Sequence, residues 1–178
     1  AVDLVVELCR TRLPQNMGVE AGQIQVLCPT RKGEWGTGAL NRALQAALNP
    51  PAPDKRQKTW GDMVFRVGDR VMQIRNNYDV LWEKSDGTAG TGIFNGDVGV
   101  VEAIDPAGEL LQVRFDDRTA AYTPDMLSEL ELAYAVTVHK AQGSEYRAVV
   151  LVALPAAPAL MVRGVLYTGI TRARELLV

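Results

Sequence analysis

Two short polar segments in the last third of the chain contain side chains that could act on a phosphorylated ligand. The first follows an apolar run and extends from Thr137 to Glu145 (TVHKAQGSE). Its hydroxyl, imidazole and amide groups can donate hydrogen bonds to phosphate or stack on a base, and its lysine adds a positive charge. Gly143 permits close backbone approach, and Glu145 can accept a hydrogen bond from a ribose hydroxyl. The segment predicts a ligand site at the end of a strand, although such a loop can also be an ordinary solvated turn.

The second segment extends from Leu166 to Arg174 (LYTGITRAR). An arginine at a helix end can neutralise charge that develops on a transferred γ-phosphoryl group. Because Arg172 and Arg174 are two residues apart on a predicted helix, they should point in different directions, so only one of them should serve a given ligand. The alternative is a surface arginine that is solvated or paired with Glu175.

The N-terminal elements that would position these segments are a helix, a strand and a second helix. Apolar residues recur at helical spacing over residues 2–13, and Pro14 ends that pattern. Residues 24–28 form a short apolar run rich in branched side chains, which is typical of a buried strand in a parallel sheet. A helix should follow over residues 37–48, with Thr37 as its N-cap and Pro50 just beyond its end.

After residues 63–129, the C-terminal part of the chain again has the pattern of buried strands and a helix. The predicted elements are strands at 133–138 and 148–154, a helix at 160–173 and the beginning of a strand at 176–178. Together with the N-terminal elements, they predict one α/β domain built from residues 1–62 and 130–178.

Residues 63–129 have the pattern of a small antiparallel β-barrel. Short alternating or branched runs are separated by tight-turn residues, at 69–75, 97–104, 110–115 and 120–123. The polar stretch 50–61 is typical of a linker. Residues 76–91, with Tyr78 and Trp82 beside a glycine- and serine-rich tip, are predicted to form an exposed loop.

Composition limits the classes of function. The 178 residues are 47% hydrophobic and carry a formal net charge of −2, so any contact with nucleic acid has to be local. Cys9 and Cys28 lie in apolar segments, which indicates buried reduced thiols and a cytoplasmic protein. The longest apolar run, 148–162, is interrupted by prolines and is too short for a membrane span. There is no initiator methionine, and the chain ends at the start of a predicted strand, so we expect it to be part of a longer protein.

The two polar segments, in this order, resemble the fifth and sixth helicase motifs of superfamily 1, in the RecD/TraA-like branch. The segment 26–33 (VLCPTRKG) resembles the start of the second RecA-like domain in that branch. Residues 65–73 (FRVGDRVMQ), 76–78 (NNY) and 94–99 (FNGDVG) resemble the SH3-like insertion of those helicases. The resemblance implies a RecA-like (P-loop NTPase-type) parallel sheet domain interrupted by a small SH3-like β-barrel at 63–129.

The resemblance also implies a function, the C-terminal motor half of an ATP-dependent 5′ to 3′ DNA helicase. ATP with Mg²⁺ would bind between two RecA-like domains, with Arg172 as the catalytic arginine finger and Gln142, Gly143 and Glu145 bordering the nucleotide. The chain departs from a complete helicase in one respect, since it has no GxxxxGK[ST] loop and no strand ending in paired acidic residues. The preceding RecA-like domain would therefore hold most of the nucleotide and Mg²⁺, and this chain alone should be inactive.

The implied partners are single-stranded DNA, duplex junctions, the preceding RecA-like domain and other repair subunits, with no membrane. The predicted DNA contacts are Thr137, His139 and Lys140, then Thr30, Arg31 and Asn41 near the first strand, and Arg75 and Tyr78 in the barrel. For Thr30, Arg31 and Asn41 a capping or turn role is an equal alternative. Arg66, Arg70 and Trp82 are further barrel candidates. The alternative functions are a non-catalytic DNA-binding or protein-docking module of a DNA repair or recombination complex, and a relative that keeps the fold without ATPase activity.

Overall fold

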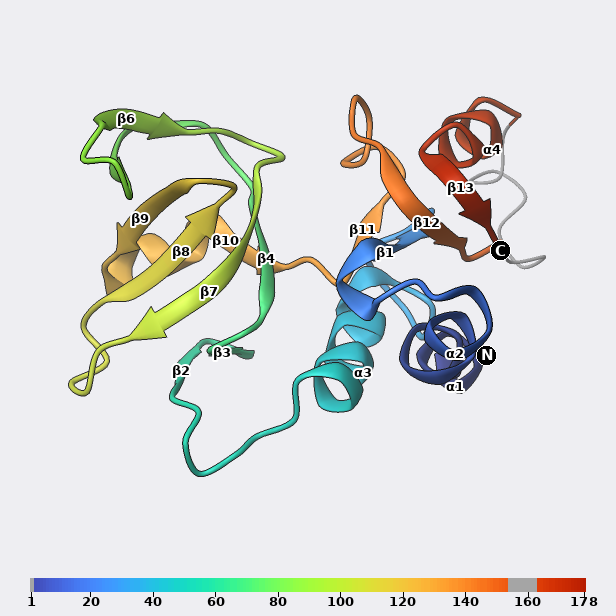
Figure 1. Cartoon of the computed structure of the whole chain (residues 1–178), viewed down its shortest axis with the longest axis horizontal. Coiled ribbons are helices and arrows are strands. Elements are labelled where there is room, and N and C mark those ends of the chain that lie inside the picture. Colours follow the sequence, from blue (N-terminus) through green and yellow to red (C-terminus); the bar gives the residue numbers. More distant parts are fainter. Residues whose placement is uncertain (1, 154–162) are drawn as a thin grey trace. The chain divides into compact units, whose positions relative to one another are not determined.

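The structure, a computed structural model, describes residues 2–153 and 163–178 (Figure 1). It has two compact units, which we call the α/β unit (residues 1–50 and 134–178) and the β unit (residues 51–133). The predicted α/β fold with an inserted β module is confirmed. The boundaries between the two units along the chain lie at 50/51 and 133/134, and not at the predicted 62/63 and 129/130. Strand β2 (Gln57–Trp60) pairs with β3 (Met63–Arg66), and β10 (Leu130–Leu132) pairs with β4 (Arg70–Gln73), so both flanking segments belong to the β unit.

The α/β unit is built on a parallel four-stranded sheet. Its order is β11 (Ala135–Thr137), β1 (Ile24–Cys28), β12 (Tyr146–Leu151) and β13 (Ala173–Leu177). Every residue of β1 is buried, because helices cover both faces of a sheet of this kind. This explains why four of its five residues are apolar.

Helices cover the two faces of this sheet separately. Val26 and its neighbours on one face pack in a single cluster with Leu40 of α3 (Thr37–Leu48) and with the N-terminal helix. On the other face, Gly169 of α4 (Arg163–Ile170) lies against Leu151. Figure 1 shows α4 on the opposite side of the sheet from α3.

The N-terminal helix extends further than the sequence pattern predicts. It consists of α1 (Val2–Glu7), a π-helical turn η1 (Leu8–Arg12) and α2 (Leu13–Met17). Pro14 has no backbone N–H to donate, but it directly follows the wider π turn, and the helix continues past it. The helix ends at Gly18, which has φ 62°. Helix α3 has Gly36 as its N-cap, and Thr37 is its first residue.

The β unit contains a seven-stranded antiparallel sheet. Its order is β10, β4, β7 (Val98–Ile104), β8 (Leu111–Phe115), β9 (Arg118–Tyr122), β5 (Asn77–Lys84) and β6 (Ala89–Ile93). A 3₁₀ turn, η3 (Pro124–Glu129), leads into β10, and another, η2 (Ala21–Gln23), precedes β1 in the α/β unit. The core of the β unit includes Phe65, Phe115 and Tyr122.

Two predictions for the inserted module were wrong. Residues 76–91 form most of the hairpin β5–β6 and are not a loop, and the linker 50–61 contains β2. Most residues of these strands are exposed or half-buried, so no alternation of apolar and polar residues marks them in the sequence. Backbone pairing with β9 and β3 makes them strands.

The C-terminal elements differ from the prediction mainly at their boundaries. Strand β12 begins at Tyr146, two residues before the predicted start at Ala148. Helix α4 ends at Ile170, and Ala173 already belongs to β13, because the chain turns at residues 171–172. Residues 154 and 160–162 of the predicted elements lie outside the described residues.

Candidate functional site

Parallel pairing places the predicted site residues at two opposite edges of the sheet in the α/β unit. Cys28 lies beside Thr137 at the carboxyl edge, so the loops that begin at Pro29 and Val138 leave the sheet side by side. At the other edge, Tyr146 lies beside Ala173 where β12 and β13 begin. The connection 138–145 runs from the first edge to the second and joins the two groups of candidates.

Arg172 is held against the polar connection 138–145. Its Nη1 donates to the Ser144 carbonyl at 2.9 Å, and its Nε donates to the Thr168 carbonyl at 3.2 Å. Its own carbonyl accepts from the Tyr146 amide at 2.8 Å. The two polar segments recognised in the sequence are therefore neighbours in space.

Neither arginine of the second segment lies on a helix, contrary to the prediction. Arg172 is in the turn after α4, and Arg174 is on β13. Glu175 pairs with Arg147 at 2.8 Å. The predicted helix ends early because β13 needs residues 173–177 for pairing with β12.

Gly143 and Glu145 are exposed and precede β12, near the edge of the sheet where β12 and β13 begin. Gly143 has φ 81°, a left-handed conformation that favours glycine, and no atom lies within 4 Å of where a Cβ would be. The Glu145 carboxylate accepts from Arg174 Nε at 2.8 Å. Both side chains are more than half exposed, so solvent weakens this ion pair and a ligand could compete for Glu145.

His139 and Gln142 face the first turns of α4 across a pocket of about 290 Å³. Val138, Gly164, Val165 and Thr168 complete its lining. The backbone here is fixed by Thr137, whose Oγ1 accepts from the Lys140 amide at 3.3 Å. His139 and Gln142 are exposed, which leaves their polar atoms accessible to a ligand.

Thr30 and Arg31 belong to a compact loop between β1 and α3. The Thr37 amide donates to the Thr30 carbonyl at 3.2 Å, and Thr30 Oγ1 accepts from the Lys32 amide at 3.4 Å. Arg31 is exposed at this carboxyl edge. Thr30 thus has the turn role that was its alternative, and the residue as a whole is half-buried.

Asn41 has a structural role. Its Nδ2 donates to the Ala135 carbonyl at 2.9 Å, and its Oδ1 accepts from the Ala135 amide at 2.8 Å. Its side chain is buried and joins α3 to β11. We therefore do not keep Asn41 among the predicted DNA contacts, because a buried amide occupied in this way cannot reach a strand on the surface.

The two cysteines are buried free thiols, as the sequence indicated. Burial raises the pKa of Cys9 to about 12 and that of Cys28 to about 11. The Cys28 thiol donates to the Thr30 carbonyl at 3.2 Å and so supports the loop at the carboxyl edge. Both thiols stay protonated at neutral pH.

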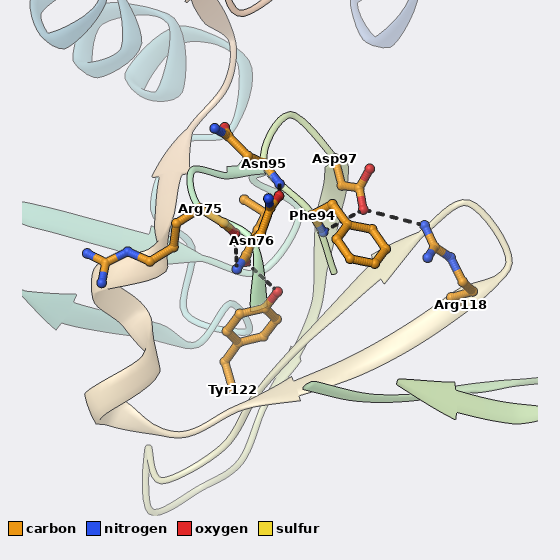
Figure 2. Close-up of polar contacts among 8 residues, drawn as sticks. Arg75, Asn76, Phe94, Asn95, Asp97, Arg118 and Tyr122 are labelled. Carbon is orange, nitrogen blue, oxygen red and sulfur yellow. Dashed lines mark hydrogen bonds and ion pairs between the residues drawn. The ribbon is translucent and has the colours of Figure 1, made fainter. Parts of the chain in front are cut away.

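The β unit presents Arg75 and Tyr78 to solvent, whereas Arg66 is buried and donates to Gln57 Oε1 at 3.1 Å. The Tyr78 ring meets the Phe94 ring edge to face, with centroids 5.4 Å apart. Figure 2 shows Arg75 extending away from Phe94, with Asn76 and Asn95 between them. Phe94 and Asn95 were not among the predicted contacts, although the Phe-Asn-Gly turn sequence was visible.

Trp82 is half-buried on β5, where its ring lies over Gly90 of the neighbouring strand. The Arg118 guanidinium carbon and Lys84 Nζ lie 5.7 and 5.9 Å from its ring centroid. This ring therefore packs across β6, with two positive charges near it.

Within residues 2–153 and 163–178, no three His, Cys, Asp or Glu side chains gather as a metal site would require. No helix among the described residues is long and apolar enough to cross a membrane.

Two families match the chain in succession. Residues 40–115 match the ATP-dependent RecD-like DNA helicase SH3 domain, and residues 132–178 match the UvrD-like helicase C-terminal domain. The chain is 38% identical over 154 residues to the ATP-dependent RecD2 DNA helicase of Deinococcus radiodurans, covering 86% of this chain and 19% of that protein. It is 26% identical over 154 residues to the RecBCD enzyme subunit RecD of Buchnera aphidicola subsp. Schizaphis graminum, covering 85% and 23%. The chain spans less than a quarter of the length of either relative.

Among solved structures, the Bacteroides Pif1 helicase in complex with ADP-AlF3 and ssDNA matches with a TM-score of 0.55 and 20% identity, over 99% of this chain and 44% of that one. The Pif1 helicase of Candida albicans matches with a TM-score of 0.52 and 16% identity, over 95% and 47%. These likenesses concern the fold, a RecA-like parallel sheet with an SH3-like insertion. With two helicase families matched in order and RecD helicases aligned along most of its length, the chain belongs to the RecD-like superfamily 1 helicases and carries their SH3 domain and C-terminal helicase domain.

Proposed function

We propose that this chain is the second motor domain of an ATP-dependent 5′ to 3′ DNA helicase. ATP would bind between it and a preceding RecA-like domain that supplies the phosphate loop and the Mg²⁺ ligands. Closure of the two domains around ATP and their reopening after hydrolysis would move the protein along single-stranded DNA. Within this family, other subunits of a repair complex are candidate partners.

The contact between Arg172 and Ser144 carries this proposal. It places a guanidinium beside Gly143 and Glu145 at the sheet edge where β12 and β13 begin. In the complete site, Arg172 would exchange a carbonyl acceptor for a γ-phosphate oxygen and neutralise charge in the transition state. Gln142, Gly143 and Glu145 would border the nucleotide.

The DNA contacts are proposed at the opposite, carboxyl edge of the sheet. Thr137, His139 and Lys140 lie there with Thr30 and Arg31, because β1 and β11 are parallel neighbours. The exposed Arg31 and the partly exposed Lys140 can meet backbone phosphates, and His139 can stack on a base. His139 and Gln142 line one pocket, so the proposed DNA and nucleotide contacts adjoin along the connection 138–145.

The test is DNA-stimulated ATP hydrolysis by the full-length protein with Arg172→Ala. We expect the turnover number to fall by about a thousandfold or more, as for other arginine fingers, while ATP still binds. Arg172→Lys should recover little activity, because an ammonium group cannot reproduce the planar fork of donors.

Arg147→Ala is the matched control. Arg147 pairs with Glu175 near the start of β12 without touching the connection 138–145, so this change should leave turnover nearly unchanged. Circular dichroism should confirm that each variant is folded. Full turnover by folded Arg172→Ala would contradict the proposed role.

A further inference from the structure

The β unit carries an exposed aromatic pair that its own core does not use. Tyr78 is 67% exposed and Phe94 is 39% exposed, and their rings meet at an interplanar angle of 67°. An aromatic face open to water is a platform on which any nucleic-acid base can stack. The question is whether the chain holds these rings in place, as a binding site requires.

Tyr78 is fixed by the side chain that precedes it. Asn77 Oδ1 accepts from the Asp79 amide at 3.0 Å, which closes a turn around Tyr78. Asn77 Nδ2 donates to both oxygens of the Glu129 carboxylate, at 3.1 and 3.0 Å. Tyr78 is therefore anchored through Asn77 to the end of η3.

Phe94 is fixed by a second set of hydrogen bonds. Its amide donates to Asp97 Oδ2 at 2.9 Å, and Asp97 also lies 3.8 Å from Arg118. The next amide, of Asn95, donates to Asn76 Oδ1 at 3.0 Å and links the Phe94 turn to the segment that carries Tyr78. Figure 2 shows these links around the Phe94 ring.

A buried polar network lies beneath both segments. Gln73, which is fully buried, accepts from the Tyr122 hydroxyl at 2.7 Å and donates to Glu129 Oε2 at 2.8 Å. Gln73 Nε2 also donates to the Arg75 carbonyl at 3.0 Å. Buried networks whose members are satisfied hold one conformation. The backbone that presents Arg75 and Tyr78 is thus fixed from below.

The charges around the pair nearly cancel. Arg75 is exposed and can meet one phosphate, whereas Arg118 is already opposed by Asp97, and Asp79 adds a negative charge beside Tyr78. A ligand held mainly by phosphate contacts would need an excess of positive charge. The surface is instead suited to a base stacked on a ring, with a single phosphate contact.

We propose that Tyr78 and Phe94 form a base-stacking subsite for single-stranded DNA on the β unit, with Arg75 contacting an adjacent phosphate. The asparagine links and the Gln73–Glu129 network keep the rings in the stacking position before DNA arrives. This subsite rests on the proposed helicase function and adds a contact with single-stranded DNA outside the α/β unit.

Binding of a short fluorescein-labelled oligo(dT) to the full-length protein tests the subsite by anisotropy over a range of salt concentrations. Tyr78→Ala with Phe94→Ala should weaken binding roughly 5- to 150-fold, the range for loss of one stacked base, without changing the slope of log K against log salt. Arg75→Ala should reduce the magnitude of that slope by about 0.7, the value for one phosphate contact on a single strand.

Two substitutions are matched controls. Trp60→Ala removes an exposed aromatic residue of β2, and Arg114→Ala removes an exposed arginine of β8 that lies 3.6 Å from Glu102. Both should leave affinity and salt slope unchanged. Tyr78→Phe should keep wild-type affinity, because the phenyl ring still stacks.

Photocrosslinking separates stacking from a purely structural role of the rings. An oligonucleotide with 5-iododeoxyuridine should crosslink to Tyr78 or Phe94, as mapped by mass spectrometry. Unchanged affinity of the double variant together with no crosslink at either ring would overturn the subsite. The helicase proposal would survive that result if the wild-type protein shows DNA-stimulated ATPase activity, and would fail by itself if that stimulation is absent.

Discussion

Asn41 and Arg172 show how the same kind of contact can have different consequences for a residue. Both side chains bind backbone carbonyls from a distant segment, Asn41 at Ala135 and Arg172 at Ser144. Asn41 is buried with both amide atoms engaged, so it can only join α3 to β11. Arg172 is half-buried at an open edge, where a stronger acceptor can replace the Ser144 carbonyl as its hydrogen-bond partner.

The structural role of Asn41 gives a prediction at this scale. Asn41→Ala should lower the free energy of unfolding of the α/β unit by about 1–3 kcal/mol, because the amide and carbonyl of Ala135 lose their partner in a buried place. Urea unfolding of the chain followed by circular dichroism at 222 nm measures this, since helices α1 to α4 all lie in the α/β unit. Arg42→Ala, at the exposed neighbour, is the control and should change stability by less than about 0.5 kcal/mol.

At the scale of elements, the β unit depends on close approach between strands. Gly99 of β7 is buried against β8, and a Cβ added there would lie 2.7 Å from the Arg114 carbonyl oxygen and 2.7 Å from Val113 Cγ1. The carbonyl belongs to the strand backbone and cannot rotate away as a side chain could. The spacing of β7 and β8 therefore requires glycine at this position.

Gly99→Ala should destabilise the β unit by about 1–3 kcal/mol through overpacking. Hydrogen exchange of the β7 and β8 amides would show this as lost protection, while the amides of β1 and β12 in the α/β unit keep theirs. Gly22→Ala is the control, since nothing lies within 4 Å of a Cβ at that position. Equal protection in Gly99→Ala and wild type would show that the two strands can separate without cost.

At the scale of the whole molecule, we propose that the chain holds one wall of a nucleotide site. Its 178 residues contain no GxxxxGK[ST] phosphate loop. We predict that the purified 178-residue chain does not turn over ATP, with or without single-stranded DNA. Phosphate release measured against the full-length protein checks this, and more than one turnover per chain would contradict the split site.

The sequence by itself determined the class of fold and the candidates for residues that carry chemistry. The mainly apolar runs at β1 and β12 indicate burial on both faces, and hence a parallel sheet with helices on each side. The polar segments around Gln142 and Arg172 were recognisable because their residue types and order are local features. The inserted β module was visible from its tight turns.

Only the tertiary structure decided which of these residues meet, because such contacts join segments far apart in the chain. Arg172 reaches Ser144 through the pairing of β12 with β13, and Asn41 is withdrawn from solvent by β11, 94 residues away along the chain. The hairpin β5–β6 was missed because its exposed strands are specified by backbone pairing, which has no local pattern. The Tyr78–Phe94 pair likewise exists only because that hairpin folds back and brings the two rings together.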